Sequence, residues 1–181
     1  MSLLKKALGA LLGLLVVAFG VGFALPSDVH VERAITINAP SDQVFAQISD
    51  FKAWDAWSPW AKIDPDAQMT VTGAGVGQTM VWASENPQVG NGSQEVTALE
   101  APGLLKTHLA FDGQGVADAT FNLTADGEGA TQVTWSLDSS MGEEMPVYMQ
   151  PVNAYMGLLM NAMVGKDYET GLQNLKEVVE G

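Results

Sequence analysis

Three tryptophans spaced by three residues form the clearest side-chain cluster in this 181-residue sequence. On a helical turn, Trp54, Trp57 and Trp60 fall within about 120° of one another, so their rings face one region. Such rings can line the mouth of a pocket and hold an apolar or aromatic ligand. The same rings can instead plug the edge of a sheet where helices meet it, and the sequence leaves both roles open.

A methionine cluster is the second candidate for contact with an apolar molecule. Six of the nine methionines fall between Met141 and Met163, and methionine side chains adapt to varied apolar partners. They can equally fill gaps where a long helix crosses a curved sheet. Met80 and Trp82 share one face of a predicted strand and are expected to look onto the same space. The expected cavity lining is Trp54, Trp57, Trp60, Met80, Trp82, Tyr148, Tyr155, Met156, Leu159, Met160 and Met163.

Polar residues that could carry catalysis are few and scattered. Arg33 falls on the apolar face of a predicted strand, where its charge needs a carboxylate partner, which we favour, or the polar group of a ligand. His108 is expected to face solvent, and nothing suggests a partner for His30. Tyr148 and Tyr155 could hydrogen-bond a ligand or backbone carbonyls.

Motifs for catalysis or metal binding are missing from the sequence. The two histidines have no carboxylate at ligand spacing, so no metal site is predicted. Nucleophilic motifs, phosphate loops and paired general acids are also absent. The sequence therefore predicts no catalytic residue and no cofactor, and it favours a role other than an enzyme.

The elements that must position these side chains follow from the hydrophobic pattern. Period-two alternation predicts strands near residues 29–38, 68–73, 77–84, 89–100, 104–111, 116–124 and 131–138. Helical spacing predicts two short helices, at residues 42–48 and 51–57, and one long helix from residue 152 to about residue 179. Short turns make consecutive strands antiparallel, and the long helix can cover the apolar face of the sheet. The expected α+β fold is a helix grip: a curved seven-stranded antiparallel sheet that encloses a cavity against the helix.

The first 27 residues differ from the predicted domain at residues 28–181. Lys5 and Lys6 precede 19 uncharged residues, 7–25, which would span roughly 28 Å as a helix, close to the hydrocarbon thickness of a bilayer. We expect an uncleaved transmembrane anchor in the inner membrane, with the lysines inside and the domain on the outer, periplasmic side. The small residues Gly22 and Ala24 leave cleavage near Ala24, followed by secretion, as the alternative.

Charge and cysteine content exclude several classes of partner and site. All 21 acidic residues follow Pro26, where only six basic residues remain, which gives the domain a net charge of −15. Such a surface repels nucleic acid and anionic headgroups, and it also favours solubility. Because there is no cysteine, disulfides, thiolate metal sites and cysteine nucleophiles are ruled out.

Several segments resemble the SRPBCC superfamily of START-like proteins, which includes the polyketide cyclase/dehydrase and lipid transport family. The matching residues are 31–40, the tryptophan-rich 54–60, 89–93, 133–136 and 165–175, within a resemblance that covers about 29–180. The resemblance implies the helix-grip fold. It implies no single function, because this superfamily mixes binders, carriers, cyclases and co-chaperone domains.

Three functions remain open from the sequence. We favour a membrane-tethered domain that binds or carries a lipid or other small hydrophobic molecule in the cavity. The second is an enzyme of the polyketide cyclase/dehydratase type, which needs an ionisable cavity residue such as Arg33, Tyr148, Tyr155 or His108. The third is a ligand-free interaction module of the co-chaperone type. The expected partners are the hydrophobic ligand and the membrane, with no nucleic acid; no oligomeric state is predicted.

Overall fold

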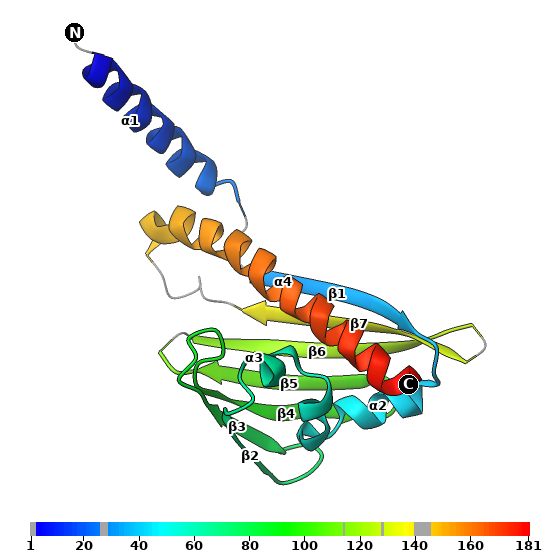
Figure 1. Cartoon of the computed structure of the whole chain (residues 1–181). Coiled ribbons are helices and arrows are strands. Elements are labelled where there is room, and N and C mark those ends of the chain that lie inside the picture. Colours follow the sequence, from blue (N-terminus) through cyan, green and yellow to red (C-terminus); the bar gives the residue numbers. More distant parts are fainter. Residues whose placement is uncertain (1–2, 26–28, 114, 128, 140–145) are drawn as a thin grey trace.

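The computed structural model describes residues 3–25, 29–113, 115–127, 129–139 and 146–181, which form one sheet, one long helix and shorter helices (Figure 1). The strands are β1 (Val29–Ile37), β2 (Gln68–Thr72), β3 (Thr79–Ala83), β4 (Gly92–Glu100), β5 (Leu104–Phe111), β6 (Gly115–Asp126) and β7 (Ala130–Ser139). The helices are α1 (Leu3–Gly22), α2 (Ser41–Ile48), the 3-10 helix η1 (Phe51–Ala56), α3 (Pro59–Ile63), the 3-10 helix η2 (Val147–Met149) and α4 (Gln150–Glu180).

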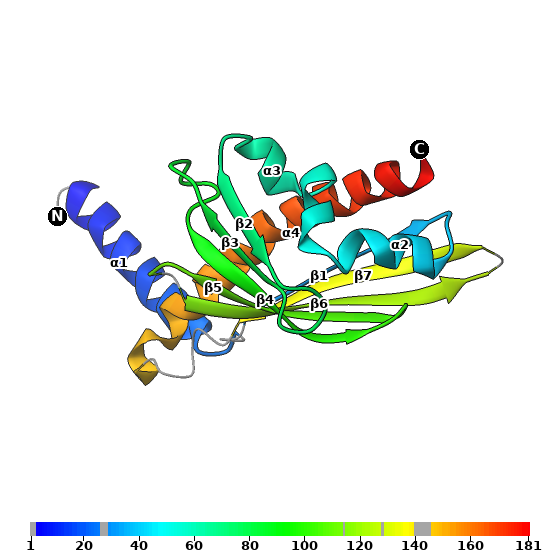
Figure 2. The ribbon, with the colours of Figure 1, turned by 90° about the horizontal axis from the view of Figure 1, so that it is seen from below.

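The seven strands form one antiparallel sheet in the order β1-β7-β6-β5-β4-β3-β2. The first strand pairs with the last, Ile35 opposite Val133, so the connection from β1 to β2 must cross the sheet from edge to edge. That connection contains α2, η1 and α3, which lie with α4 on the same face of the curved sheet (Figure 2). The predicted α+β helix-grip arrangement of sheet and long helix is confirmed.

One face of the sheet forms the core because apolar and polar residues alternate along each strand. On β6, Ala117, Ala119, Phe121 and Leu123 are buried, while Asp118 between them is exposed. Register continues this face into the neighbouring strand, since Phe121 lies opposite Trp135 of β7.

The second half of α4 is fastened firmly to the sheet. Tyr168, Leu172 and Leu175 are fully buried beneath it, and the Nδ2 of Asn174 donates a hydrogen bond to the Trp57 carbonyl at 3.0 Å. A Cβ at Gly171 would collide with the ring of Trp135, so glycine allows the helix to approach the sheet closely.

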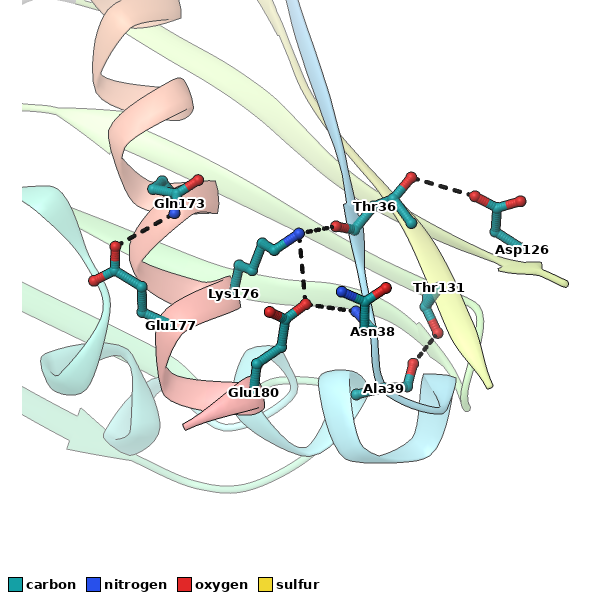
Figure 3. A network of polar contacts seen from close by, with 9 residues as sticks. All are labelled: Thr36, Asn38, Ala39, Asp126, Thr131, Gln173, Lys176, Glu177 and Glu180. Atoms are coloured by element: carbon teal, nitrogen blue, oxygen red, sulfur yellow. Dashed lines mark hydrogen bonds and ion pairs between the residues drawn. The ribbon is translucent and has the colours of Figure 1, made fainter. Parts of the chain in front are cut away.

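A polar network holds the C-terminal end of α4 against the end of β1 (Figure 3). The Nζ of Lys176 donates to the carbonyl of Thr36 at 2.8 Å, and the backbone N–H of Asn38 donates to Glu180 Oε1 at 2.6 Å. Lys176 also pairs with Glu180 at 3.5 Å. The backbone hydrogen bond from Asn38 lowers the pKa of the Glu180 carboxyl below its usual value.

Helix α1 lies outside this core and packs against the start of α4 (Figure 1). Gly22 is buried beside Pro151, and the hydroxyl of Tyr155 donates to the Ala18 carbonyl at 2.6 Å. By length and composition α1 could cross a membrane, and nearly all of its surface is exposed. An N-terminal signal sequence has the same two properties.

Element ends lie within about three residues of the prediction, and the largest shift is in β4, which was predicted from residue 89 and begins at Gly92. The 3-10 helix η2 was not predicted, and two further differences concern the segment after α2. The segment from Phe51 forms a 3-10 helix rather than an α-helix, and a further five-residue helix, α3, follows it. Pro59 begins α3, two residues after residue 57, where the second short helix was predicted to end. Proline fits the first turn of a helix because its missing N–H would have no partner there.

Candidate ligand cavity

A cavity of about 570 Å³ lies between the inner face of the sheet and the first half of α4. This volume is in the range of small-molecule sites. The lining residues on the helices are Trp54, Trp60, Ala61, Met156, Met160, Met163, Val164, Asp167 and Tyr168. The sheet contributes Met69, Met80, Trp82, Gln94, Leu109, Phe111, Val116, Ala117, Ala119, Trp135, Leu137 and Ser139. Ala67 and the segment 87–91 complete the rim.

The position of the cavity follows from side-chain size along β6. At Phe121, a large ring fills the space under the sheet. Two and four residues earlier on the same face, Ala119 and Ala117 are small, and both line the cavity. Because α4 continues across this part of the sheet, small strand residues beneath it leave space that large ones would fill.

An aromatic cluster closes the cavity at its Phe121 end. Trp135 is stacked between two rings, with centroids 4.6 Å from Phe121 and 3.7 Å from Tyr168. Trp54 and Trp57 meet this stack edge-on. Both of these indole N–H groups are satisfied, Trp54 by the Ile48 carbonyl at 2.9 Å and Trp57 by the Gln47 carbonyl at 3.1 Å.

Trp135 differs from these two tryptophans in its hydrogen bonding. Its Nε1 is buried and has no hydrogen-bond partner within the described part of the chain, and the residue lines the cavity. Leaving such a donor unsatisfied costs about 1–3 kcal/mol. The atom has almost no exposed surface, so a bound molecule with an acceptor oxygen would reach it only if the rings packed around it shift. Burial raises the pKa of the Tyr168 hydroxyl, which keeps this buried group neutral.

The remaining polar groups of the lining include one ionisable acid and no cation. Asp167 lies on the cavity side of α4, and desolvation raises the pKa of its carboxyl. Gln94 is buried, and its Nε2 donates to Thr107 Oγ1 at 2.8 Å. Among the described residues that line the cavity, there is no lysine, arginine or histidine. The described lining therefore offers no positive charge to an anionic ligand.

A bulky aromatic pair borders the cavity on its β3 side. Trp82 and Phe111 meet edge-to-face with centroids 6.0 Å apart, and both line the cavity. The ring of Trp82 lies over Gly92, where any Cβ would collide with it. Glycine at this position is what lets the tryptophan cover the sheet.

Seven of the eleven residues expected to line a cavity do so. These are Trp54, Trp60, Met80, Trp82, Met156, Met160 and Met163. The plug and pocket interpretations both apply, because Trp54 and Trp60 pack in the aromatic cluster and also face the cavity. Met141, the first residue of the predicted methionine cluster, lies outside the described residues.

The other four residues lie outside the lining of this cavity. Trp57 is fully buried within the aromatic cluster and does not reach the cavity. Tyr155 bonds α1 instead, while Tyr148 and Leu159 are exposed at 67% and 54%. On α4 the cavity side passes through Met156, Met160 and Met163, and the helical turn directs Leu159 away from it.

The polar candidates lie outside the cavity lining. Arg33 has the carboxylate partner that we favoured, because its Nε donates to Glu169 Oε1 at 2.6 Å. His108 is exposed as expected and pairs with Asp118 at 2.7 Å. His30 pairs with Asp138 at 2.6 Å, a partner that the sequence did not suggest. Within the described ranges, no group of three potential metal ligands occurs.

Sequence reasoning missed Trp135, Asp167 and Tyr168 as cavity residues. A usable signal existed for each of them. Trp135 shares the apolar face of its strand with Val133 and Leu137. Asp167 and Tyr168 fall one helical turn after Met163 and Val164, respectively.

Comparison with known proteins agrees with this architecture. The family profile described as polyketide cyclase / dehydrase and lipid transport matches residues 28–180. The fold is similar to a Streptomyces aromatase/cyclase, Zhui, with 18% identity, a TM-score of 0.59, and coverage of 84% of this chain and 94% of that one. It is also similar to the Aha1 protein of Colwellia psychrerythraea (18% identity, TM-score 0.57, 84% and 96% covered). A START superfamily protein from Mycobacterium smegmatis is a third likeness (16% identity, TM-score 0.57, 84% and 97% covered). No curated protein matches the chain.

Proposed function

The chain belongs to the polyketide cyclase / dehydrase and lipid transport family, and on that premise we propose that it binds or carries a small hydrophobic molecule. The cavity between sheet and α4 carries the proposal. Its volume of about 570 Å³ suits a small molecule, and most of its lining side chains are apolar. The ligand we propose is uncharged and mainly apolar, with one acceptor oxygen for the unsatisfied N–H of Trp135.

The absence of a cation in the described lining supports the choice of an uncharged ligand. An anionic headgroup in the cavity would meet the Asp167 carboxyl and no lysine, arginine or histidine. Burying a charge without a partner is costly, whereas a ketone, ester or alcohol oxygen needs only a donor.

We further propose that α1 tethers the domain to the inner membrane, with the domain on the outer side. Lys5 and Lys6 stand before the apolar run, which favours their retention on the cytoplasmic side. The alternative is cleavage near Ala24 and release of the domain. An intact N-terminus on the membrane-extracted protein would support the tether, and a mature chain that begins after Ala24 would contradict it.

Binding of a neutral environment-sensitive dye such as Nile red tests the cavity assignment. Ala119→Phe places a ring inside the cavity, next to the space that Phe121 already fills. We expect dye affinity to fall at least tenfold. The matched control is Ala125→Phe on the exposed part of the same strand, which should bind like the wild type. Equal binding by all three proteins would contradict the proposal.

A cyclase- or dehydratase-like enzyme is the second candidate function, and Asp167 is the observation that favours it. A half-buried carboxyl with a raised pKa in a cavity can exchange a proton with a bound molecule. An enzymatic role predicts a chemical change in the bound ligand that stops in Asp167→Asn while binding survives. Ligand recovered unchanged from both proteins would favour the carrier.

A further inference from the structure

The first half of α4 and the segment before it form an uncharged surface on an otherwise acidic domain. From Pro146 to Gly165, 20 consecutive residues carry no charge, and the charged residues of α4 all follow from Lys166 onward. Many of the apolar side chains in this stretch are exposed: Val147 at 76%, Tyr148 at 67%, Val152, Tyr155, Met156, Leu158 and Leu159 at 40% to 56%, and Met163 at 63%. An exposed apolar surface of this extent marks a contact site for a protein or a membrane.

The start of this uncharged surface (residues 146–165) lies beside the last turns of α1 (Figure 1). Tyr155 bonds the carbonyl of Ala18, and Pro151 packs on Gly22. Ala18 is four residues before Gly22, the last residue of α1, which is about 6 Å along the helix. If α1 spans a bilayer, Tyr155 therefore lies at the depth of the outer headgroups and upper acyl chains.

The composition of the surface suits that depth. Charged side chains are expensive among acyl chains, and the surface has none. Tyr148 and Tyr155 carry an apolar ring with a polar tip, the type of residue that gathers at membrane interfaces. The rest of the domain is strongly acidic and is repelled by anionic lipids, so this surface is the part able to approach them.

The cavity reaches the same surface. Met156 and Met163 line the cavity, yet they are 48% and 63% exposed, so they form part of its rim. A molecule that leaves the cavity past these two side chains would enter the medium that covers the uncharged surface.

We propose that the uncharged surface rests in the outer interface of the lipid bilayer and that the cavity exchanges its ligand with the membrane past Met156 and Met163. This inference deepens the proposed function and rests on α1 spanning the membrane. A second copy of the chain is the competing occupant. The bilayer is favoured because the surface is continuous with α1 at the level of its last turns.

Lipid-quenching measurements on the full chain test where the surface lies. The sequence has no cysteine, so single cysteines can be introduced for labelling with a polarity-sensitive fluorophore. Leu159→Cys probes the uncharged surface, and Thr124→Cys on the exposed side of β6 is the matched control. In nanodiscs of phosphatidylcholine and phosphatidylglycerol, brominated acyl chains should quench the label at position 159 and leave the control unchanged. Equal quenching at both positions overturns the proposal. So does an unquenched label at position 159 whose emission depends on protein concentration, which would identify a second copy as the occupant.

Ligand transfer to vesicles separates this inference from the proposed function. Leu159→Glu adds a charge to the surface but not to the cavity, whose lining does not include Leu159. We expect Nile red to leave this variant for phosphatidylcholine vesicles about tenfold more slowly than it leaves the wild type, with equal affinity in detergent. Thr124→Glu should transfer at the wild-type rate. Unchanged transfer by Leu159→Glu overturns the exchange route, whereas failure of every variant to bind dye in detergent overturns the proposed function instead.

Discussion

The unsatisfied indole N–H of Trp135 makes a sharp prediction about ligand selectivity. Trp135→Phe removes the donor and keeps an aromatic ring in the stack between Phe121 and Tyr168. A net hydrogen bond contributes about 0.5–1.5 kcal/mol, so the variant should lose about twofold to twelvefold in affinity for an acceptor-bearing ligand. Affinity for a ligand without an acceptor should stay the same.

The stability of the ligand-free protein gives an independent magnitude for the same substitution. Deleting an unsatisfied buried donor should recover about 1–3 kcal/mol, while the smaller ring leaves a void that costs about 1 kcal/mol. Trp135→Phe should therefore unfold at the same free energy as the wild type or at a slightly higher one. Trp57→Phe is the matched control, because its N–H has a partner in the Gln47 carbonyl. That variant should be destabilised by about 2–4 kcal/mol with no change in selectivity.

Competition against Nile red measures the selectivity. The two competitors are 2-dodecanone and dodecane, which have chains of the same length and differ in one acceptor oxygen. Each competitor partitions into the micelles to the same extent with either protein, so comparing the ratio of affinities between the wild type and Trp135→Phe in one detergent cancels that effect. A ratio that is equal in the wild type and in Trp135→Phe would refute the assigned role of the indole.

Three further predictions follow from the cavity and from the carboxyl groups with shifted pKa values. Ala119→Phe fills part of the cavity, so we expect its melting temperature to equal or exceed that of the wild type. Circular dichroism measures this, with Ala125→Phe as the control. A loss of several degrees would show that the space is already filled. Burial raises the pKa of Asp167, so its contribution to stability is full below the unfolded pKa and is lost as pH rises through the folded pKa. Asp167→Asn should therefore unfold less readily than the wild type near pH 7, and identical urea midpoints would contradict this. The backbone N–H of Asn38 lowers the pKa of Glu180, so the contribution of the Glu180 carboxylate to stability is present above the unfolded pKa and is lost as pH falls through the folded pKa. Glu180→Gln should therefore narrow the difference in urea midpoint between pH 6 and pH 3. An unchanged difference would contradict the role of the polar network at the end of α4.

Most of the fold could be predicted from the period-two pattern of the strands. From β2 to β7, consecutive strands are joined by short turns, and alternation gives the strands one apolar face; these two local signals suffice for antiparallel order. Helix α3 was missed because five residues hold little more than one turn, too short for helical spacing to register. Proline is also common just after the end of a helix, so Pro59 alone did not identify the start of one.

The cavity was harder to predict because its lining depends on which way each side chain points. The first half of α4 has apolar residues on most of its circumference, so periodicity could not separate Met156 and Met160, which face the cavity, from Leu159, which faces outward. Equal spacing likewise placed Trp54, Trp57 and Trp60 together in the expected cavity lining, although packing against Trp135 buries Trp57 completely. Tertiary contacts determine both the outward direction of Leu159 and the burial of Trp57. The hydrophobic pattern of a single segment does not reveal those contacts.

Arg33 shows what a single strand can predict. A cation on an apolar face needs a countercharge, and Glu169 supplies it from α4, 136 residues later in the chain. The need was visible in the sequence. The identity of the partner depends on how α4 crosses β1, where a Cβ at Gly165 would collide with the guanidinium.

Native mass spectrometry of the full chain, released from membranes without added ligand, tests the central claim most directly. Wild-type protein and Ala125→Phe should each retain one uncharged, mainly apolar molecule, and Ala119→Phe should retain none. The retained molecule should carry at least one acceptor oxygen. Wild-type protein that is repeatedly empty, or a bound molecule that Ala119→Phe retains equally well, would contradict the assignment of the cavity.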